Sequence, residues 1–507
     1  MDNELVEVEK TEIPKAVPPE PCIVVIFGVT GDLTHRELIP SLYALNCKGL
    51  LPRPFAIIGF ARRDWNDDFF RNEMKNTMKK VNECGEEEWK LFSKNLFYVK
   101  GNFNDDPSTS YKNLNDKIKQ VQKDLNIPDN VLFHLSTPPE NYGEIIERLG
   151  AASLSKSEKG WRRVIIEKPF GRNEKSARIL DEAINKVFDE EQIFRVDHYL
   201  GKETVQNMLV FRFANPGFEP IWNRNYIEHV QITVSEELGI GTRGNFYEST
   251  GVIRDMVQNH LLQLLCMTAI EPPVNYDSHS LRSETVKVLD SICKINIEKD
   301  VVLGQYDSGE VNGEKLPAYR DENNVAENSI TPTYAAFKIM LDNWRWAGVP
   351  FFLRTGKRLK NKLTEVTIQF KSTPHLMFPT YKRHPSHRNV LTFRLQPDEG
   401  IIYTFMAKQP GAELHLKPVN LNFQYDTAFG ISEPPSAYQW LLFDAMKGDQ
   451  TLFPRADWIY KAWSIIDPII NQWEKEPWLK VPNYKAGTWG PEEADKLLSV
   501  QGCKWRS

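Results

Sequence analysis

Short apolar runs alternate with amphipathic helical segments along the first 200 residues of the chain. Helical periodicity is found, for example, over 67–81 and 174–188. Strands that are apolar on both faces and separated by helices are typical of a parallel sheet covered on both sides. The pattern therefore predicts a doubly wound α/β domain over residues 21–200. Its candidate strands are Cys22–Phe27, Pro54–Phe60, Leu96–Lys100, Asn130–Leu135, Arg162–Glu167 and Gln192–Val196.

From about residue 201 the candidate strands alternate strictly between apolar and polar positions. In Glu228–Glu237 the residues Val230, Ile232 and Val234 share one face, and His229, Gln231, Thr233 and Ser235 share the other. Thr364–Phe370 and Asn389–Leu395 also have two different faces. Such alternation is typical of antiparallel sheets with one covered side. We expect a second, larger β+α domain over 201–507, built on a mostly antiparallel sheet.

Composition places the chain among ordinary folded proteins, because 41% of the residues are hydrophobic and 26% are charged. The 63 Lys and Arg residues against 68 Asp and Glu give a formal net charge of −5. This balance argues against a general attraction to polyanions, so nucleic acid is not an expected partner. An anionic ligand would have to be met by a local cluster of cations.

The first 20 residues are acidic and rich in proline, and we expect them to form a disordered tail. They contain neither the apolar core of a secretory signal nor the Arg and Ser bias of a transit peptide. No apolar run approaches the ~18 residues that a membrane span needs. A cytoplasmic location without a membrane partner is therefore expected.

A glycine-rich turn follows the first candidate strand and precedes a candidate helix. A turn of this kind lets the backbone approach a pyrophosphate, whose charge then lies at a helix N-terminus. A tight strand-to-helix turn without a ligand would have the same composition. The position of the turn in an α/β domain favours nucleotide binding. Its candidate coenzyme ligands are Gly28, Thr30, Gly31, Asp32 and Leu33.

Two arginines, Arg62 and Arg63, follow the second candidate strand. An NAD enzyme tends to carry Asp or Glu at this point, whereas a guanidinium group matches the 2′-phosphate of NADP. The alternative is a pair of solvated surface arginines. We expect NADP as the cofactor. A P-loop is excluded at Gly201-Lys202, because Glu203 stands where that motif needs Ser or Thr.

His260 lies on the apolar face of a candidate helix, where a histidine is more often a core residue than a catalyst. The segment 195–202, RVDHYLGK, changes that balance, because it gathers an acid, an imidazole, a phenol and an ammonium group. These groups follow the last parallel strand, where open α/β sheets bind ligands. The strand must end near Asp197 if Asp197 and His198 are to serve one site.

The same motifs resemble the glucose-6-phosphate 1-dehydrogenase family. The resemblance spans the chain from about Cys22 to about Pro491. Its motifs, in chain order, are GVTGDL, EKPFG, RVDHYLGK, FANPGFEPIWNR, RDMVQNHLLQ, GVPFFLRTGKRL and LFDAMKGDQTLFPR. The resemblance implies a Rossmann-type dinucleotide-binding domain joined to a larger β+α domain. It also implies a homodimer or homotetramer.

The resemblance further implies that the chain transfers a hydride from carbon 1 of glucose 6-phosphate to NADP, giving 6-phosphogluconolactone. His260 matches the general base and Asp197 its partner carboxylate, and Lys168 matches a lysine placed between sugar and coenzyme. A neutral imidazole can accept the proton as the hydride departs, and a carboxylate orients it. The remaining matched substrate residues are His198, Tyr199, Lys202, Glu236, Asp255, Lys357, Lys362 and Gln396.

Glu37 departs from the family pattern, because it stands where the family usually has a substrate-binding lysine. A carboxylate near a dianionic substrate is unfavourable, although it can accept hydrogen bonds from sugar hydroxyls. Two alternatives are therefore kept: a related NAD(P)-dependent oxidoreductase for another sugar or sugar phosphate, and a non-catalytic NADP-binding sensor. No metal is expected, since His384 and His387 lie in a polar, proline-interrupted loop.

Overall fold

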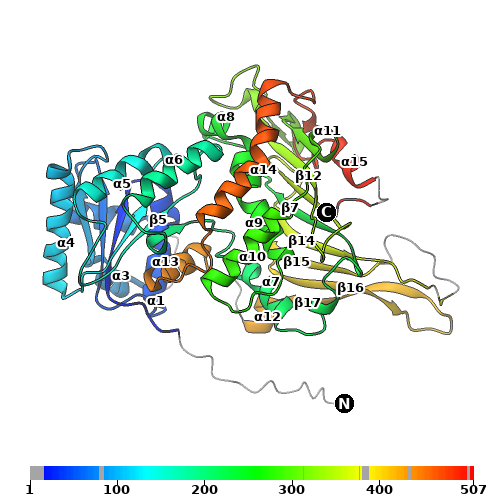
Figure 1. Cartoon of the computed structure of the whole chain (residues 1–507), viewed down its shortest axis with the longest axis horizontal. Coiled ribbons are helices and arrows are strands. Elements are labelled where there is room, and N and C mark those ends of the chain that lie inside the picture. Colours follow the sequence, from blue (N-terminus) through cyan, green and yellow to red (C-terminus); the bar gives the residue numbers. More distant parts are fainter. Residues whose placement is uncertain are drawn as a thin grey trace, which may run out of the picture. The chain divides into compact units, whose positions relative to one another are not determined.

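Six apolar strands form a parallel sheet in the order β3-β2-β1-β4-β5-β6 in the computed structural model (Figure 1). Every residue of the central strand β1 is buried, as a sheet covered on both faces requires. The sheet confirms the predicted doubly wound arrangement. Its strands are β1 (Cys22–Phe27), β2 (Phe55–Ala61), β3 (Leu96–Lys100), β4 (Val131–Leu135), β5 (Arg162–Ile166) and β6 (Ile193–Arg195).

The structure describes most of the chain. The described residues are 16–78, 85–311, 313–375, 377–378, 388–430, 435–499 and 503–506. They form two compact units. The first unit comprises the chain up to Thr137, Arg148–Ile165 and Leu442–Gly448; the second comprises Pro138–Glu147, Ile166–Leu441 and the chain from Asp449. Most of the expected N-terminal tail lies outside the described residues.

The helices between these strands agree in type with the predicted ones. The helix expected over 67–81 is α2 (Asp67–Met78), whose remaining positions lie outside the described residues. The helix expected over 174–188 is α6 (Glu174–Asn185), which begins with a capping box between Asn173 and Ser176. The other helices in this part of the chain are α1 (Ile39–Cys47), α3 (Gly85–Ser93), α4 (Lys112–Leu125) and α5 (Tyr142–Ala151).

The second unit contains an eight-stranded sheet in the order β17-β16-β15-β14-β7-β13-β12-β8. Its neighbours pair antiparallel except β7 and β13, which are parallel, and this confirms the mostly antiparallel prediction. The strands are β7 (Ile227–Ser235), β8 (Val301–Gly304), β12 (Tyr334–Met340), β13 (Pro350–Gly356), β14 (Leu363–Phe370), β15 (Val390–Gln396), β16 (Gly400–Lys408) and β17 (Leu416–Gln424).

The polar face of β7 differs from the expectation of a sheet with one covered side. The four polar residues of this face are each at most 3% exposed, so β7 is covered on both faces. Polar side chains can be buried there because they form hydrogen bonds. For example, Gln231 binds backbone groups of Lys504 and Arg506 from the C-terminal end of the chain.

Helices that carry or support the candidate site lie beside this sheet. A segment with π-helical hydrogen bonding, η6 (Ile253–Leu261), continues directly into the fully buried helix α9 (Leu262–Ala269). α14 (Ala456–Lys475) packs against η6 and against α10 (Ser278–Asp290). Two further helices adjoin site residues in the sequence: α7 (Glu203–Phe213) directly follows Lys202, and α8 (Gly244–Val252) directly precedes η6.

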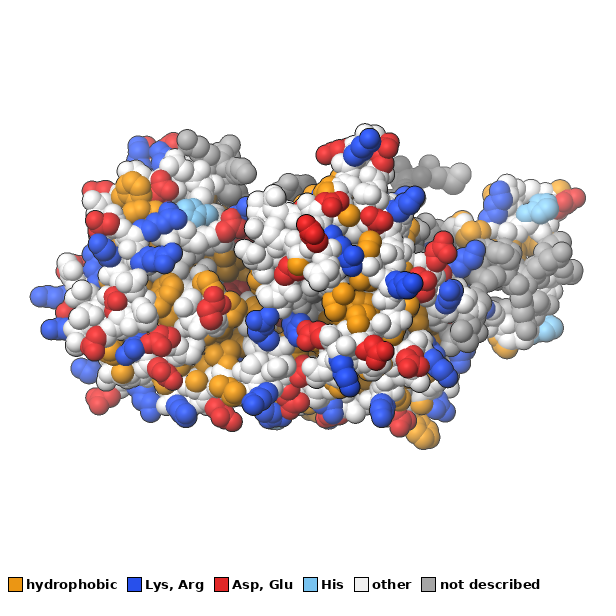
Figure 2. Space-filling view, turned by 90° about the horizontal axis from the view of Figure 1, so that it is seen from above, with side chains coloured by type: hydrophobic (Ala, Val, Ile, Leu, Met, Phe, Trp, Pro, Cys, Tyr) orange, Lys and Arg blue, Asp and Glu red, His pale blue; other side chains and the backbone are white. Residues whose placement is uncertain are grey.

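On the face seen in Figure 2, basic and acidic side chains are interspersed, and neither sign of charge forms a large patch. This agrees with the small net charge of −5. None of the described helices combines the length and the hydropathy that crossing a membrane requires.

Candidate active site

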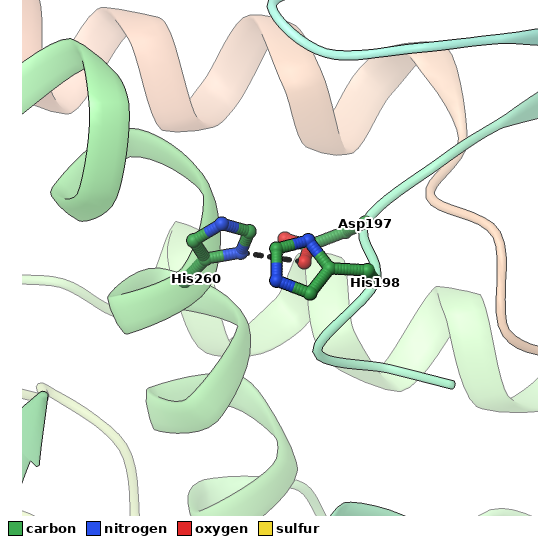
Figure 3. A group of neighbouring side chains, drawn as sticks. All are labelled: Asp197, His198 and His260. Atoms are coloured by element: carbon green, nitrogen blue, oxygen red, sulfur yellow. Dashed lines mark hydrogen bonds and ion pairs between the residues drawn. The ribbon is translucent and has the colours of Figure 1, made fainter. Parts of the chain in front are cut away.

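Asp197 and His260 form a buried hydrogen-bonded pair in the second unit. The strand β6 ends at Arg195, so Asp197 lies in the turn that follows it, as the sequence predicted. His260 comes from η6, and its Nδ1 lies 2.6 Å from Asp197 Oδ1 (Figure 3). Both side chains are almost fully buried. Water is thereby kept away from the pair, which strengthens the interaction between carboxylate and imidazole.

The contacts of His260 fix the roles of its two ring nitrogens. Because Nδ1 faces a carboxylate, Nδ1 carries the hydrogen and donates it to Asp197. Nε2 lies 2.8 Å from Lys168 Nζ and accepts a hydrogen bond from the ammonium group. Nε2 therefore holds a lone pair, which is the property that a general base needs.

The charges around the pair favour a neutral imidazole beside an ionised carboxylate. Burial lowers the pKa of His260, and although Asp197 opposes this change, Lys168 adds to it. Burial alone would raise the pKa of Asp197, but His260, His198 and Lys168 together lower it to about 2. Asp197 is therefore a carboxylate, and His260 is poised to accept a proton, at neutral pH.

Lys168 links the pair to a set of carboxylates. Its Nζ lies 3.1 Å from the carbonyl oxygen of Asp255 and 3.5 Å from Asp255 Oδ1. Asp255 Oδ2 in turn lies 4.0 Å from Lys357 Nζ, and Lys357 is ion-paired with Glu236. Although burial opposes ionisation, Lys168 and Lys357 lower the pKa of Asp255. Lys168, Glu236, Asp255 and Lys357 thus form one cluster with the His260 pair.

Aromatic and cationic groups from 198–202 lie on another side of His260. The rings of Tyr199 and His260 stack with centroids 4.2 Å apart, and those of His198 and His260 are 4.6 Å apart. Lys202 Nζ lies 5.4 Å from the Tyr199 ring and donates a 2.8 Å hydrogen bond to Gln396 Oε1. Burial, with help from His260 and Lys168, lowers the pKa of His198 well below its usual range.

Lys362 is the one predicted substrate residue that this cluster does not include. It lies directly before β14 and is exposed. Within the described part of the chain, no hydrogen bond or ion pair joins it to the other site residues.

The glycine-rich turn in the first unit has the shape that a pyrophosphate cradle needs. Gly28 has φ +79°, and a Cβ atom there would lie 2.3 Å from the carbonyl oxygen of Ser136. Gly31 donates to the carbonyl of Gly28 at 2.9 Å, which closes the turn before η1 (Thr34–Leu38). Only glycine fits at position 28, so the local fold suits the close approach of a dinucleotide backbone.

The two arginines predicted to select the coenzyme lie at the carboxyl end of β2. Arg62 and Arg63 are both exposed, directly after the last residue of the strand. The guanidinium carbon of Arg63 lies 5.4 Å from the centre of the Trp65 ring. Tyr98 donates a 2.7 Å hydrogen bond to the carbonyl of Arg63, which holds the backbone of this turn.

Comparison with known proteins places the chain in a family. Two family models match it: "Glucose-6-phosphate dehydrogenase, NAD binding domain" over residues 25–207 and "Glucose-6-phosphate dehydrogenase, C-terminal domain" over residues 209–506. The chain belongs to the glucose-6-phosphate dehydrogenase family. The resemblance seen in the motifs is confirmed.

Relatives and solved structures agree over nearly the whole chain. Glucose-6-phosphate 1-dehydrogenase of Aggregatibacter actinomycetemcomitans is 45% identical over 96% of this chain and 97% of its own. The Chlamydia pneumoniae enzyme is 44% identical over 97% of each chain. A glucose-6-phosphate dehydrogenase solved in complex with glucose 6-phosphate has a TM-score of 0.89 at 33% identity, covering 97% of this chain and 100% of that one. The Mycobacterium avium enzyme has a TM-score of 0.80 at 34% identity, covering 97% and 99%.

Two sequence features remain to be placed: Glu37, which departs from the family pattern, and the histidines at 384 and 387. Glu37 is a partly buried residue of η1 in the first unit. His384 and His387 fall outside the described residues.

Two tyrosines next to the site were not predicted. The ring of Tyr247, from α8, lies 5.2 Å from Lys357 Nζ, and its buried hydroxyl has no hydrogen-bond partner among the described residues. Tyr438 stacks on His198 with ring centroids 6.5 Å apart and donates to Glu167 at 3.1 Å. Neither belongs to a chemically distinctive motif, so the sequence offered no signal for them.

Proposed function

We propose that the chain oxidises carbon 1 of glucose 6-phosphate with NADP as the hydride acceptor and His260 as the general base. The oxidation of glucose 6-phosphate to phosphogluconolactone follows from membership of the family, over nearly the full length of the chain. The roles of the residues rest on one observation above all. The Asp197–His260 pair presents the unprotonated Nε2 within a cluster of lysines and carboxylates.

His260 Nε2 accepts the proton of the carbon-1 hydroxyl as the hydride leaves that carbon. Asp197 then stabilises the imidazolium that forms at His260. Because Lys168 contacts Nε2, the sugar hydroxyl has to replace the ammonium group at that atom. The bound nicotinamide ring supplies the hydride acceptor. The turn at Gly28 is the proposed cradle for its pyrophosphate, since only glycine leaves room there.

The phosphate of the substrate is assigned to His198, Tyr199 and Lys202. Lys202 Nζ donates a hydrogen bond to the side-chain oxygen of Gln396 and lies beside the Tyr199 ring, on the same side of His260 as His198. An approaching dianion would favour the charged form of His198 and offset the burial that lowers its pKa. The sugar hydroxyls are assigned to Glu236, Asp255 and Lys357, with Lys362 and Gln396 as further contacts. Carboxylates suit hydroxyl donors.

A steady-state assay of NADPH formation tests the proposal by comparing glucose 6-phosphate with glucose and galactose 6-phosphate. The cations around Lys202 are expected to favour glucose 6-phosphate over free glucose by ~10²-fold or more in kcat/KM, since hydrogen bonds to charged groups contribute ~1.5–3 kcal/mol each. Comparable efficiency on free glucose would refute the assignment. It would favour the alternative function, an oxidoreductase for another sugar. The negative charge of Glu37 is the sequence feature that supports this alternative.

NADP rather than NAD is the proposed coenzyme because two guanidinium groups follow β2. The double variant Arg62→Ala, Arg63→Ala is expected to raise KM for NADP by ~10-fold or more, because charge-assisted bonds to the 2′-phosphate are lost. KM for NAD should change little. The exposed Arg178→Ala variant serves as the control. An equal effect on both coenzymes would assign the two arginines to the pyrophosphate or to folding.

A homodimer or homotetramer is also proposed. β16 and β17 at the edge of the large sheet are partly or fully exposed over most of their length. A groove of about 680 Å³ beside them is lined by apolar side chains, among them Phe211, Phe218, Tyr403, Leu421, Phe423 and Phe429. Apolar patches of this kind mark association surfaces. Light scattering of the purified chain should therefore give at least twice the chain mass of 58.6 kDa.

We propose that residues 21–200 form the coenzyme-binding domain. Residues 201–507 form the domain that binds the substrate and carries the contacts between copies of the chain. The two family models meet between residues 207 and 209, close to that boundary.

A further inference from the structure

The last described residues, 503–506, lie on the polar face of the large sheet, and we call them the C-terminal strap. Gln231 of β7 holds the backbone of the strap on two sides. Its Nε2 donates to the carbonyl of Lys504 at 2.9 Å, and its Oε1 accepts from the backbone N–H of Arg506 at 2.9 Å. A side-chain amide that pairs with a backbone donor and a backbone acceptor has only one suitable orientation.

His229 extends this network to the first residue of the strap. Gln231 Nε2 also lies 3.1 Å from His229 Nε2, so His229 accepts there and carries its hydrogen on Nδ1. That Nδ1 faces Cys503 Sγ at 3.5 Å and the Glu228 carboxylate at 3.7 Å. Burial, with Arg388 and Arg506, lowers the pKa of His229 to about 4, so the ring is neutral at pH 7.

The atoms of Glu228, His229 and Cys503 lie close enough to hold a metal ion. Two contacts favour a structural lock instead. The nitrogen that would have to bind the metal, Nδ1, carries the hydrogen, and Glu228 is ion-paired with Arg388. The cluster therefore fastens the strap to β7.

Arg354 of β13 depends on the strap for part of its environment. The side chain is 1% exposed, and within the described chain no carboxylate lies at ion-pair distance from it. Its Nε donates to Thr233 Oγ1 at 3.0 Å, and its Nη2 donates to the carbonyl of Arg506. The guanidinium carbon lies 4.7 Å from the Trp489 ring and 4.6 Å from the Trp505 ring. The strap thus supplies one carbonyl and one of two aromatic faces.

Loss of the strap would leave a buried cation short of partners, which is costly. Without the strap, Arg354 could turn toward water, and its guanidinium group would no longer join β13 to β7 and the strap. β13 pairs with β7 in a register that sets Arg354 opposite Thr233 and Gly356 opposite Ser235. The residue directly after each strand is a proposed substrate residue: Lys357 follows β13 and Glu236 follows β7, and these two are ion-paired.

We propose that the C-terminal strap is a positioning device for substrate binding. By clamping β7 to β13 through Gln231 and Arg354, it sets the spacing of Glu236 and Lys357 beyond the ends of the two strands. This inference rests on the proposed function, because it assigns these two residues to the sugar phosphate. The strap touches neither of them directly, so its effect has to pass through the two strands.

Two variants test the proposal: Trp505→Ala in the full chain, and a chain that ends at Ser499. Both are expected to raise KM for glucose 6-phosphate by about fivefold or more, with kcat within about twofold and KM for NADP unchanged. A peptide of residues 500–507, added to the shortened chain, should restore KM. Trp344→Ala, which removes an indole that is 90% exposed, is the matched control and should leave all three constants unchanged.

A wild-type KM for glucose 6-phosphate in folded Trp505→Ala would overturn the proposal, as would a loss of melting temperature without a change in KM. If the shortened chain does not fold, the point variant decides. Failure of the proposed function is recognised separately, because the wild-type chain itself would then not turn over glucose 6-phosphate.

Discussion

Replacing His260 with asparagine is expected to lower kcat by ~10²-fold or more, because general base catalysis contributes at least that much. KM for glucose 6-phosphate should change little, since His260 accepts a proton only as the hydride leaves. Asparagine keeps a hydrogen-bonding group near Asp197 but has no basic nitrogen. Steady-state kinetics with NADP measure both constants.

His415→Asn is the matched control for this variant. His415 is exposed, pairs with Glu413 and lies beside the start of β17. Its replacement should leave kcat unchanged. Normal turnover by His260→Asn would mean that another group removes the proton, and the assignment of the base would be wrong.

Replacing Asp197 with asparagine is expected to lower kcat by ~10²-fold or more and to change the pH profile. The carboxylate stabilises the imidazolium and fixes the hydrogen on Nδ1, and asparagine does neither. The charge of Asp197 also raises the pKa of His260 against the effects of burial and Lys168. Without that charge the pKa of His260 falls further.

The sign of the pH effect follows from the role of the base. Protonated His260 cannot accept a proton, so kcat/KM of the wild-type chain falls as pH drops through the pKa of His260, below its usual value of about 6.5. In Asp197→Asn the acid limb should move to lower pH. A rate profile from pH 4 to 8 measures it, with the exposed Asp290→Asn as control. A shift to higher pH would contradict the assigned coupling.

The parallel sheet could be predicted because strands buried on both faces are apolar throughout, as in β1. The polar face of β7 could not be assigned in the same way. The same type of polar residue can face solvent or can bind backbone groups of a segment far away in the sequence, so residue type alone does not distinguish the two. Gln231 binds residues more distant in sequence than any periodicity window covers, at positions 504 and 506.

The candidate site was found through motifs rather than through periodicity. Helical spacing put His260 on an apolar face, which favours a core residue, and only its resemblance to a family motif gave it a role. Asp197 contacts His260 because a turn follows β6, as the sequence required. Tyr247 and Tyr438 could not be predicted, because aromatic residues are common in helices and the sequence does not show which group a tyrosine hydroxyl contacts.

The pairing of β7 has a consequence for biosynthesis. β7 ends at Ser235, but its two neighbours begin only at Pro350 and Leu363, and its polar face is covered by residues 503–506. Because the chain leaves the ribosome N-terminal end first, β7 stays unpaired while the residues between Ser235 and Pro350 are made. Residues 503–506, which cover the polar face of β7, are made only after all the strands of the sheet, and a ribosomal pause before residue 350 would leave β7 unpaired and prone to aggregation.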